Sequence, residues 1–330
     1  MTGMHLHIGD PSAVGEARRG AIALARAKHF DETDTGRVGL VVTELASNLV
    51  KHAGGGEIII VDAGDAGDAG IDVLALDRGP GIADFREAMR DGYSSAGTPG
   101  GGLGAVARLG AVFEVYSRRD AGTVLFARIA DRSQAAPTMH CVIGGVNVPH
   151  PQETISGDAW TISRRTAGVV VLVADGLGHG PQAHTAACAA AEAFHAHAQA
   201  SPGELVTRIH EALRPTRGAA VGVAEIAPGQ LRFAGLGNIA GTILANGTTR
   251  SVISHHGTAG HDVRRIQEFA YPWVANATLV LHSDGLMSRW SLDDYPGLIA
   301  KHPVLIAGVL YRDFRRGRDD TTVVVVREAA

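Results

Sequence analysis

A largely apolar segment that ends in a glycine-flanked aspartate is the feature that most constrains the fold of this sequence. Residues 71–76 are typical of a buried strand, and the motif DRGPG follows at 77–81. A second glycine cluster, GGGLG at 100–104, precedes a helix-like segment. Glycines let backbone N–H groups approach a ligand, a helix N-terminus attracts phosphate, and a buried aspartate can accept a hydrogen bond from an adenine amine. The stretch is therefore compatible with nucleotide binding, although two plain loops would show the same glycines.

Length and charge exclude several classes of protein. The chain has 330 residues, enough for two domains, and its net charge of −4 gives no electrostatic case for binding nucleic acid or a membrane. The two cysteines, Cys141 and Cys188, suggest neither a disulfide framework nor a metal site. No apolar run is long enough to span a bilayer and no signal-peptide core is present, so we expect a cytoplasmic protein.

The first 130 residues predict a layer of helices and a layer of strands. Helical periodicity indicates helices over residues 14–28 and 35–52, and strands are predicted at 57–62, 71–76, 112–117 and 123–129. Glu44 and Asn48 are four residues apart on the second helix, so they share one face. A carboxylate and an amide placed together suit a base and a Mg²⁺ ligand, but a solvated polar stripe would look the same.

Three motifs in one order carry a family resemblance: TELASN at residues 43–48, DRGPG at 77–81 and GGGLG at 100–104. This order resembles the GHKL (Bergerat) ATP-binding fold, an α/β two-layer sandwich found in histidine kinases, gyrase, Hsp90 and anti-sigma serine kinases. Over residues 5–131 the chain is most similar to the RsbT- and RsbW-like serine/threonine kinases, which act on STAS-domain proteins and often dimerise. The resemblance therefore implies ATP, Mg²⁺, a STAS-domain partner and, as one option, a homodimer.

The same resemblance assigns roles to individual residues for phosphoryl transfer, a reaction that depends on positioning and charge neutralisation. The residues it assigns are Glu44 as general base, Asn48 as Mg²⁺ ligand, Asp77 for the adenine, Gly79 and Gly81 for the adenine pocket, and Gly102, Leu103 and Gly104 for the phosphates.

A polar, alanine-rich stretch at residues 132–138 predicts a linker between a first domain at 1–131 and a second at 139–330. In the second domain, aspartates recur at apolar strand ends or in turns beside them. These positions are Asp158, Asp175, Asp284 and the pair Asp319 and Asp320. Like charges that converge repel one another unless cations lie between them, and carboxylates suit Mg²⁺ or Mn²⁺. One Asp-Gly alone would indicate only a turn.

The order SGD, ADGLGHG, HSDGL and RDDTT over residues 139–329 resembles the SpoIIE- and RsbX-like branch of the PPM metal-dependent serine/threonine phosphatases. This implies an α-β-β-α sandwich, two Mg²⁺ or Mn²⁺ ions and a catalytic role for Asp175. The ligands it implies are Asp158, Asp175 and the Gly176 carbonyl for the first ion, and Asp175, Asp284 and Asp319 for the second. The phosphate-binding arginine of eukaryotic members has no clear counterpart, and a proton-donor role for His179 stays open.

Together these patterns predict an α+β protein with two opposing activities. It would be a switch protein of a partner-switching or stressosome pathway, with a kinase of a STAS-domain protein (an anti-sigma-factor antagonist or stressosome scaffold) and a phosphoserine/phosphothreonine phosphatase on one chain. The alternative is a phosphatase whose first domain only senses ATP and docks to partners. A stand-alone ATPase is a third option.

Overall fold

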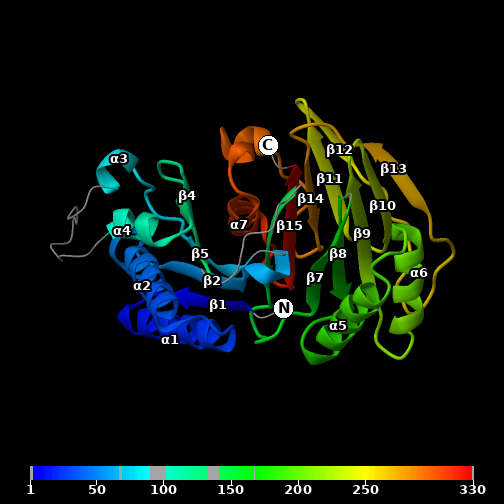
Figure 1. The fold of residues 1–330 in the computed structure, drawn as a ribbon, viewed down its shortest axis with the longest axis horizontal. Helices are drawn as coiled ribbons and strands as arrows, with labels where there is room; N and C mark the ends of the chain where they lie inside the picture. The colour runs from blue at the N-terminus through cyan, green and yellow to red at the C-terminus, as the bar shows by residue number, and fades with distance from the viewer. Residues whose placement is uncertain (1–2, 67–68, 90–101, 132–140, 167, 329–330) are drawn as a thin grey trace. The chain divides into compact units, whose positions relative to one another are not determined.

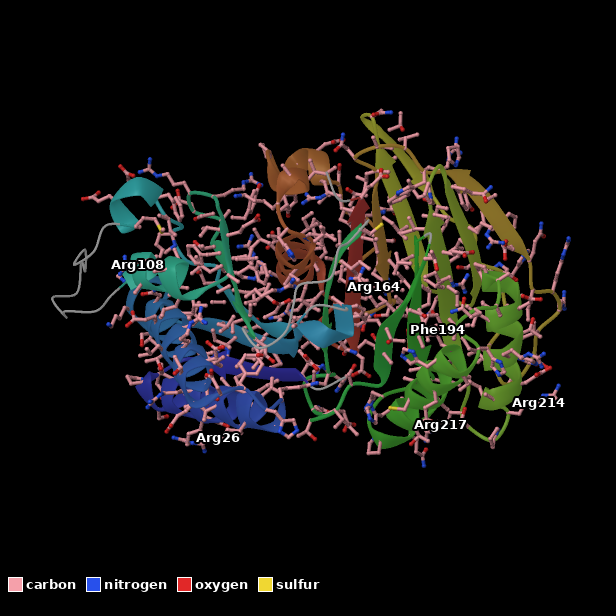
Figure 2. The ribbon with its side chains drawn as sticks, in the orientation of Figure 1. Arg26, Arg108, Arg164, Phe194, Arg214 and Arg217 are labelled. Atoms are coloured by element: carbon pink, nitrogen blue, oxygen red, sulfur yellow. The ribbon has the colours of Figure 1, made fainter. Side chains whose placement is uncertain are left out.

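The computed structural model describes residues 3–66, 69–89, 102–131, 141–166 and 168–328 (Figure 1), with their side chains shown in Figure 2. The chain forms two compact units that are interleaved in sequence. The first comprises Met1–Gly64, Asp68–Pro137 and Gly297–Arg312, and the second comprises Asp65–Gly67, Thr138–Pro296 and Asp313–Ala330. The predicted linker at 132–138 lies outside the described residues, and so do residues 90–101, which include the first two glycines of the GGGLG motif.

The first unit is built on one antiparallel sheet with strand order β1-β2-β3-β5-β4. In chain order its N-terminal elements are β1 (Gly3–Ile8), α1 (Pro11–Ala27), α2 (Glu32–Asn48), a π-helical turn (Leu49–Ala53), β2 (Gly56–Asp62), β3 (Gly70–Leu76), α3 (Phe85–Ala88), α4 (Gly102–Leu109), β4 (Val112–Ser117) and β5 (Thr123–Ala130). The predicted helices and strands are present. Strand β1 was not predicted, and the second predicted helix is divided at Asn48 into an α-helix and a π-helical turn.

Local capping explains where the long helices begin. Asp10 accepts a hydrogen bond from the Ser12 amide at 2.7 Å, and Pro11 occupies the first turn of α1, where its missing N–H has no cost. Asp31 caps α2 in the same way through the Asp34 amide at 2.6 Å. Each aspartate satisfies a backbone donor that the helix leaves unpaired, which fixes the start of the helix.

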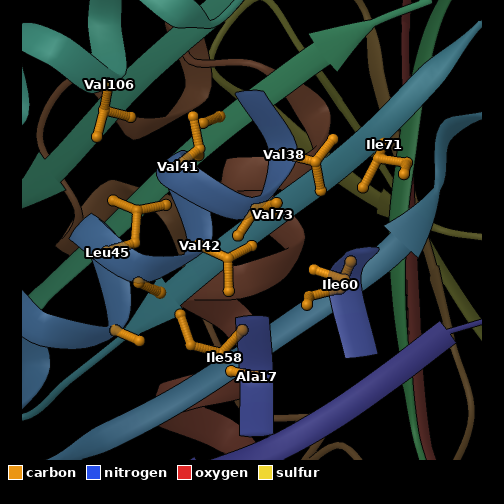
Figure 3. Close-up of a cluster of buried hydrophobic side chains, with 14 of the residues drawn as sticks. Ala17, Val38, Val41, Val42, Leu45, Ile58, Ile60, Ile71, Val73 and Val106 are labelled. Atoms are coloured by element: carbon orange, nitrogen blue, oxygen red, sulfur yellow. The ribbon is translucent and has the colours of Figure 1, made fainter. Parts of the chain in front are cut away.

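The core between these helices and the sheet consists of aliphatic side chains (Figure 3). Val38, Val41, Val42 and Leu45 occur at helical spacing on α2 and are fully buried, as the sequence pattern predicted. They pack on alternate residues of β2 and β3 and on Val106 of α4. The fully buried members labelled in Figure 3 are Ala17, Val38, Val41, Val42, Leu45, Ile58, Ile60, Ile71, Val73 and Val106.

The opposite face of the first sheet is covered by α7 (Pro303–Phe314). This helix comes long after β5, the last strand of the sheet in the chain, which ends at Ala130, and it lies outside the first domain predicted from the sequence. Residues 303–312 of α7 are all buried. A Cβ built on Gly308 would lie 2.5 Å from Leu74 Cδ2, so the helix approaches β3 closely. Tyr311 Oη donates to Glu57 at 3.1 Å, and Glu114 accepts from the His302 amide at 2.8 Å.

The chain builds most of the second unit between the end of β5 at Ala130 and the start of α7 at Pro303. The domain division predicted from the sequence did not place α7 in the first unit. Conversely, a short segment between β2 and β3 of the first unit belongs to the second unit. It includes the end of a 3₁₀ turn at Ala63–Ala66, and Ala66 is buried in the core of the second unit. Its carbonyl accepts a hydrogen bond from Arg164 Nη2 at 2.8 Å.

The second unit contains two five-stranded antiparallel sheets, with strand orders β13-β10-β9-β8-β7 and β12-β11-β14-β15-β6. Its elements are β6 (Cys141–Val148), β7 (Asp158–Arg165), β8 (Gly168–Gly176), α5 (Pro181–Ala196), α6 (Pro202–Leu213), β9 (Ala219–Ala227), β10 (Gln230–Leu236), β11 (Ala240–Ala245), β12 (Thr248–Ser251), β13 (Glu268–Pro272), β14 (Thr278–His282), a 3₁₀ turn (Leu292–Asp294) and β15 (Thr321–Glu328). A further 3₁₀ turn, Leu298–Ala300, precedes α7 in the first unit.

The two sheets of the second unit share one apolar core. Trp160 and Phe233 from the first sheet belong to the same buried cluster as Leu279 and Val324 from the second. Helices α5 and α6 pack on β8 and β9 through a separate cluster that includes Phe194. The predicted α+β class is confirmed. Among the residues that the structure describes, no helix is both long and apolar enough to cross a bilayer.

Candidate functional sites

A cavity of about 280 Å³ opens in the first unit where α2 ends. Asn48 is the last residue of α2, and the π-helical turn that follows contributes Leu49, His52 and Ala53 to the wall. π-Helical turns are rare overall, but those that occur are often found at functional sites, because they shift side chains out of the regular helical register. The complete lining is Asn48, Leu49, His52, Ala53, Asp77, Pro80, Gly81, Ile82, Ala83, Asp84, Glu87, Ala88, Gly102, Leu103, Thr123 and Leu125.

Asp77 lies in this cavity directly after β3. Its Oδ1 accepts hydrogen bonds from the Gly79 amide at 2.8 Å and the Thr123 amide at 3.1 Å. Its Oδ2 accepts none from the described residues, so this oxygen can accept from a ligand. Burial raises the pKa of Asp77, and the two amides oppose that rise.

The glycines of the DRGPG motif are required by close backbone packing. A Cβ on Gly79 would lie 2.8 Å from Ala53 Cα, and a Cβ on Gly81 would lie 2.3 Å from the Arg118 carbonyl oxygen. Gly81 also has φ of +77°, which other residues rarely adopt. Both glycines therefore let the loop after β3 pack against the π-helical turn and the β4–β5 connection.

Only some of the predicted nucleotide-site residues line the cavity. Asn48, Asp77, Gly81, Gly102 and Leu103 line the cavity. Gly79 supports Asp77, and Gly104 is buried within α4. Glu44 is half-buried one helical turn before Asn48 and is not among the lining residues.

The second site begins with two aspartates on neighbouring strands. Asp158 is the first residue of β7, and in the antiparallel pairing of β7 with β8 its direct partner is Asp175. The sequence had suggested a turn at Asp158, so its position within a strand corrects that prediction. The amide of Gly176, the last residue of β8, donates to the Gly157 carbonyl at 3.1 Å and ties the two strand ends together.

Two further segments bring acidic side chains to the same place. Asp284 follows β14, and Asp319 and Asp320 precede β15, which is the antiparallel partner of β14. A Cβ on Gly285 would lie 1.9 Å from the Asp320 carbonyl oxygen, so only glycine permits this approach. Asn238 Nδ2, in the turn after β10, donates to Asp284 Oδ2 at 2.7 Å. The sequence analysis did not predict this contact.

The pKa values show that these carboxylates act on one another. Burial raises the pKa of Asp175 most, and the charges of Asp158, Asp284, Asp319 and Asp320 raise it further. The pKa of Asp158 is raised mainly by burial and also by Asp320 and Asp319, while Ser283 opposes the rise. The pKa of Asp319 is raised by burial and by Asp284. All five predicted aspartates therefore converge in the second unit.

The donor set fits divalent cations. Asp158 Oδ2 and Asp320 Oδ2 are buried and have no hydrogen-bond partner, an expensive arrangement unless a proton or a cation is bound there. Within the described residues, no group of three or more aspartate, glutamate, histidine or cysteine side chains is arranged so that it could hold a metal ion by itself. Ions held here would therefore need backbone carbonyls, water or substrate as additional ligands, as Mg²⁺ usually does.

Histidines lie at the margin of the aspartate cluster. His179 Nδ1 is 2.8 Å from Glu153 Oε1, and the ring of His179 stacks on His150 with centroids 4.3 Å apart. The His150 amide donates to Asp320 Oδ1 at 2.8 Å. His150 and Glu153 had no distinguishing signal in the sequence, because their approach to His179 depends on the loop between β6 and β7.

Comparisons with known proteins confirm the predicted GHKL-like and PPM-type folds. Residues 9–129 match the family model for the histidine kinase-like ATPase domain, and residues 165–328 match the model for stage II sporulation protein E (SpoIIE). The serine/threonine-protein kinase RsbT of Bacillus subtilis is 38% identical over 104 residues, which are 32% of this chain and 78% of that protein.

Two solved structures resemble more than half of the chain. One, described as "The bacterial stressosome: a modular system that has been adapted to control secondary messenger signaling", has a TM-score of 0.54 and 23% identity and covers 57% of this chain and 100% of its own. RsbX in complex with magnesium has a TM-score of 0.51 and 18% identity, covering 59% of this chain and 99% of its own. At these identities the likeness shows a shared fold.

Proposed function

Since the chain belongs, through residues 9–129, to the family of histidine kinase-like ATPase domains that includes RsbT, we propose that it is a two-enzyme switch protein. Its first unit transfers phosphate from ATP to a serine or threonine of a STAS-domain protein, and its second unit removes phosphate from such residues. The observation that carries the proposal is the convergence of five aspartates with two unpartnered buried oxygens. One chain would then present opposing activities at high local concentration to the same partner.

In the first unit we assign Asn48 to Mg²⁺ and the free Oδ2 of Asp77 to the adenine amine. Gly79 and Gly81 shape that end of the cavity, and Gly102, Leu103 and Gly104 begin the helix that faces the phosphates. Glu44 is the general base, one turn before Asn48. The cavity lining supports the roles of Asn48, Asp77, Gly81, Gly102 and Leu103, and the match to RsbT supports the assignment as a whole.

In the second unit Asp158, Asp175 and the Gly176 carbonyl would hold one divalent ion, and Asp175, Asp284 and Asp319 the other. Two Mg²⁺ or Mn²⁺ ions would supply Lewis-acid activation of a water for in-line attack on phosphorus. Asn238 orients the Asp284 carboxylate, and the His150 amide fixes Asp320. His179, held by Glu153, is the group positioned to give a proton to the leaving alkoxide.

The position of Glu44 favours one alternative. Because Glu44 does not line the cavity whereas Asn48 and Asp77 do, the first unit could bind ATP and dock to a partner without transferring phosphate. The phosphatase would then be the only enzyme on the chain. The partner would be the same class of protein in both cases.

The test is to incubate the full chain with radiolabelled ATP and a STAS-domain protein, and to follow the label on the partner before and after adding Mn²⁺. We expect label to appear on serine or threonine and then to be released as inorganic phosphate. Removal without prior labelling, shown with a partner phosphorylated by another kinase, would select the ATP-sensing alternative. If no phosphate is removed from the partner in the presence of either Mg²⁺ or Mn²⁺, the phosphatase assignment is refuted.

A further inference from the structure

An exposed arginine, Arg217, lies against the loop that follows Asp175. A Cβ built on Gly178 would be 3.3 Å from Arg217 Nη1, so the guanidinium covers the bare backbone of this loop. Gly178 in turn lies beside the aspartates. A Cβ on Gly157 would be 3.5 Å from the Gly178 carbonyl oxygen and 2.7 Å from Asp320 Oδ2. Asp320, Gly157, Gly178 and Arg217 are therefore successive neighbours.

The backbone that carries Arg217 is held firmly. His261 Nε2 lies 2.9 Å from the Arg217 carbonyl oxygen, and the next carbonyl, of Gly218, accepts from the Leu177 amide at 3.0 Å. The Gly218 amide donates to Thr216 Oγ1 at 3.0 Å. The turn is therefore fixed to the metal-site loop and to the segment that contains His261.

The guanidinium group of Arg217 has no polar partner among the described residues. Within the described part of the chain, Arg217 forms no side-chain hydrogen bond and no ion pair. The backbone of Arg217 is held in place, whereas the five N–H donors of its guanidinium group are exposed. An arginine in this state is well suited to bind an anion. An arginine fork matches the oxygens of a phosphate and can bind two of them at once.

The charge of the site gives a reason for a cation at this margin. Five ionised carboxylates outweigh two divalent ions by one charge, so a phosphate monoester dianion would approach a site that is still negative. A cation beside the Gly178 loop would offset that repulsion without competing for the metal ligands.

We propose that Arg217 binds the phosphate group of the phosphoserine or phosphothreonine substrate in the second unit. The inference rests on the proposed phosphatase function and adds the residue that recognises its substrate. Arg217 lies at a turn between α6 and β9, far in sequence from every predicted metal ligand. Its place could therefore not be inferred from the aspartate motifs.

The experiment measures binding of inorganic phosphate to the full-length, Mn²⁺-loaded protein by calorimetry. The variants are Arg217→Ala, Arg217→Lys and, as matched control, Arg214→Ala, an exposed arginine of the same segment that Figure 2 shows at a different place. We expect Arg217→Ala to raise the Kd for phosphate about 10- to 100-fold, the usual loss for charge-assisted hydrogen bonds. Arg217→Lys should retain part of the affinity, and Arg214→Ala all of it.

Mn²⁺ affinity, measured in the same way without phosphate, should be unchanged in all three variants, which separates phosphate recognition from damage to the metal site. Hydrolysis of a phosphopeptide should show an increased KM for Arg217→Ala. Equal phosphate affinity in Arg217→Ala and wild type would overturn the inference, as would an equal loss of affinity in the control Arg214→Ala. The phosphatase proposal fails separately, if the wild-type protein binds phosphate but hydrolyses no phosphoprotein.

Discussion

Asp158 and Asp175 are direct cross-strand partners on β7 and β8, so two carboxylates occupy one position of an antiparallel ladder. Like charges placed opposite each other destabilise a sheet. Burial raises the pKa of both groups, and the charge of Asp158 raises the pKa of Asp175 further. The arrangement is costly for the metal-free fold and favourable once a divalent cation binds, which is the property expected of a metal site built into a strand pair.

The first prediction concerns the removal of one of these charges. Asp175→Asn should lower phosphatase activity at least about 100-fold, because even groups behind a metal ligand are worth about 10- to 100-fold. In EDTA the variant should unfold at a higher temperature than wild type, by about 2–4 °C for each kcal/mol of repulsion removed. Mn²⁺ should no longer stabilise it, while ATP binding stays intact. Asp262→Asn, an exposed aspartate outside the cluster, is the control, and full hydrolysis by Asp175→Asn would remove the two-metal assignment.

The second prediction is a pH dependence of stability. The pKa values of Asp158, Asp175 and Asp319 are raised above the value of about 3.9 in the unfolded chain. The metal-free folded state thus keeps protons that the unfolded chain releases, and the free energy of unfolding should fall as pH rises above about 4. The stabilisation by Mg²⁺ or Mn²⁺ should grow over the same range, since cations replace these protons. Melting curves with EDTA and with metal, recorded at several pH values, should diverge, and parallel curves would contradict the coupling.

The third prediction separates binding from transfer in the first unit. Asn48→Asp should weaken binding of ATP with Mg²⁺, because Asn48 lines the cavity. Glu44→Ala should leave ATP binding nearly unchanged but reduce phosphorylation of a STAS-domain protein by about 10²- to 10⁴-fold, the usual contribution of a general base. Glu32→Gln, at the exposed start of α2, is the control. Unchanged transfer by Glu44→Ala would exclude Glu44 as the base.

The fourth prediction tests the packing of α7. Gly308→Val should destabilise the protein by about 1–3 kcal/mol, because the added atoms meet Leu74 and Val124 in a filled core. Gly36→Ala, in the exposed part of α2 with no atom within 4 Å of the new Cβ, should stabilise by about 1 kcal/mol. Chemical denaturation of the two variants checks both signs. A neutral Gly308→Val would show that α7 does not pack tightly on β3.

Much of the architecture could be predicted because local patterns determine it. The helical spacing of Val38, Val41, Val42 and Leu45 identified the buried face of α2, and apolar segments that end in aspartate identified β3, β8 and β14. The order of these aspartates also led to the acidic site. Each of these patterns spans fewer than about twenty residues, the length over which periodicity is informative.

The rest depends on contacts between distant segments. The pairing of Asp158 with Asp175 depends on strand register, and the bond from Asn238 to Asp284 depends on how two separate turns meet. Arg217 lacks a motif, and its role follows only from its approach to Gly178. The apolar sequence of α7 indicates a buried helix but not the sheet that it covers.

The placement of α7 has a consequence for how the protein is made. A ribosome releases the sheet of the first unit long before it synthesises the helix that covers one face of that sheet. The nascent chain must therefore keep Leu74, Val124 and their neighbours from aggregating until residue 312 has emerged. A gene truncated after residue 137 would encode a protein with that face permanently uncovered, so the complete first unit cannot be obtained by cutting the chain at the predicted linker.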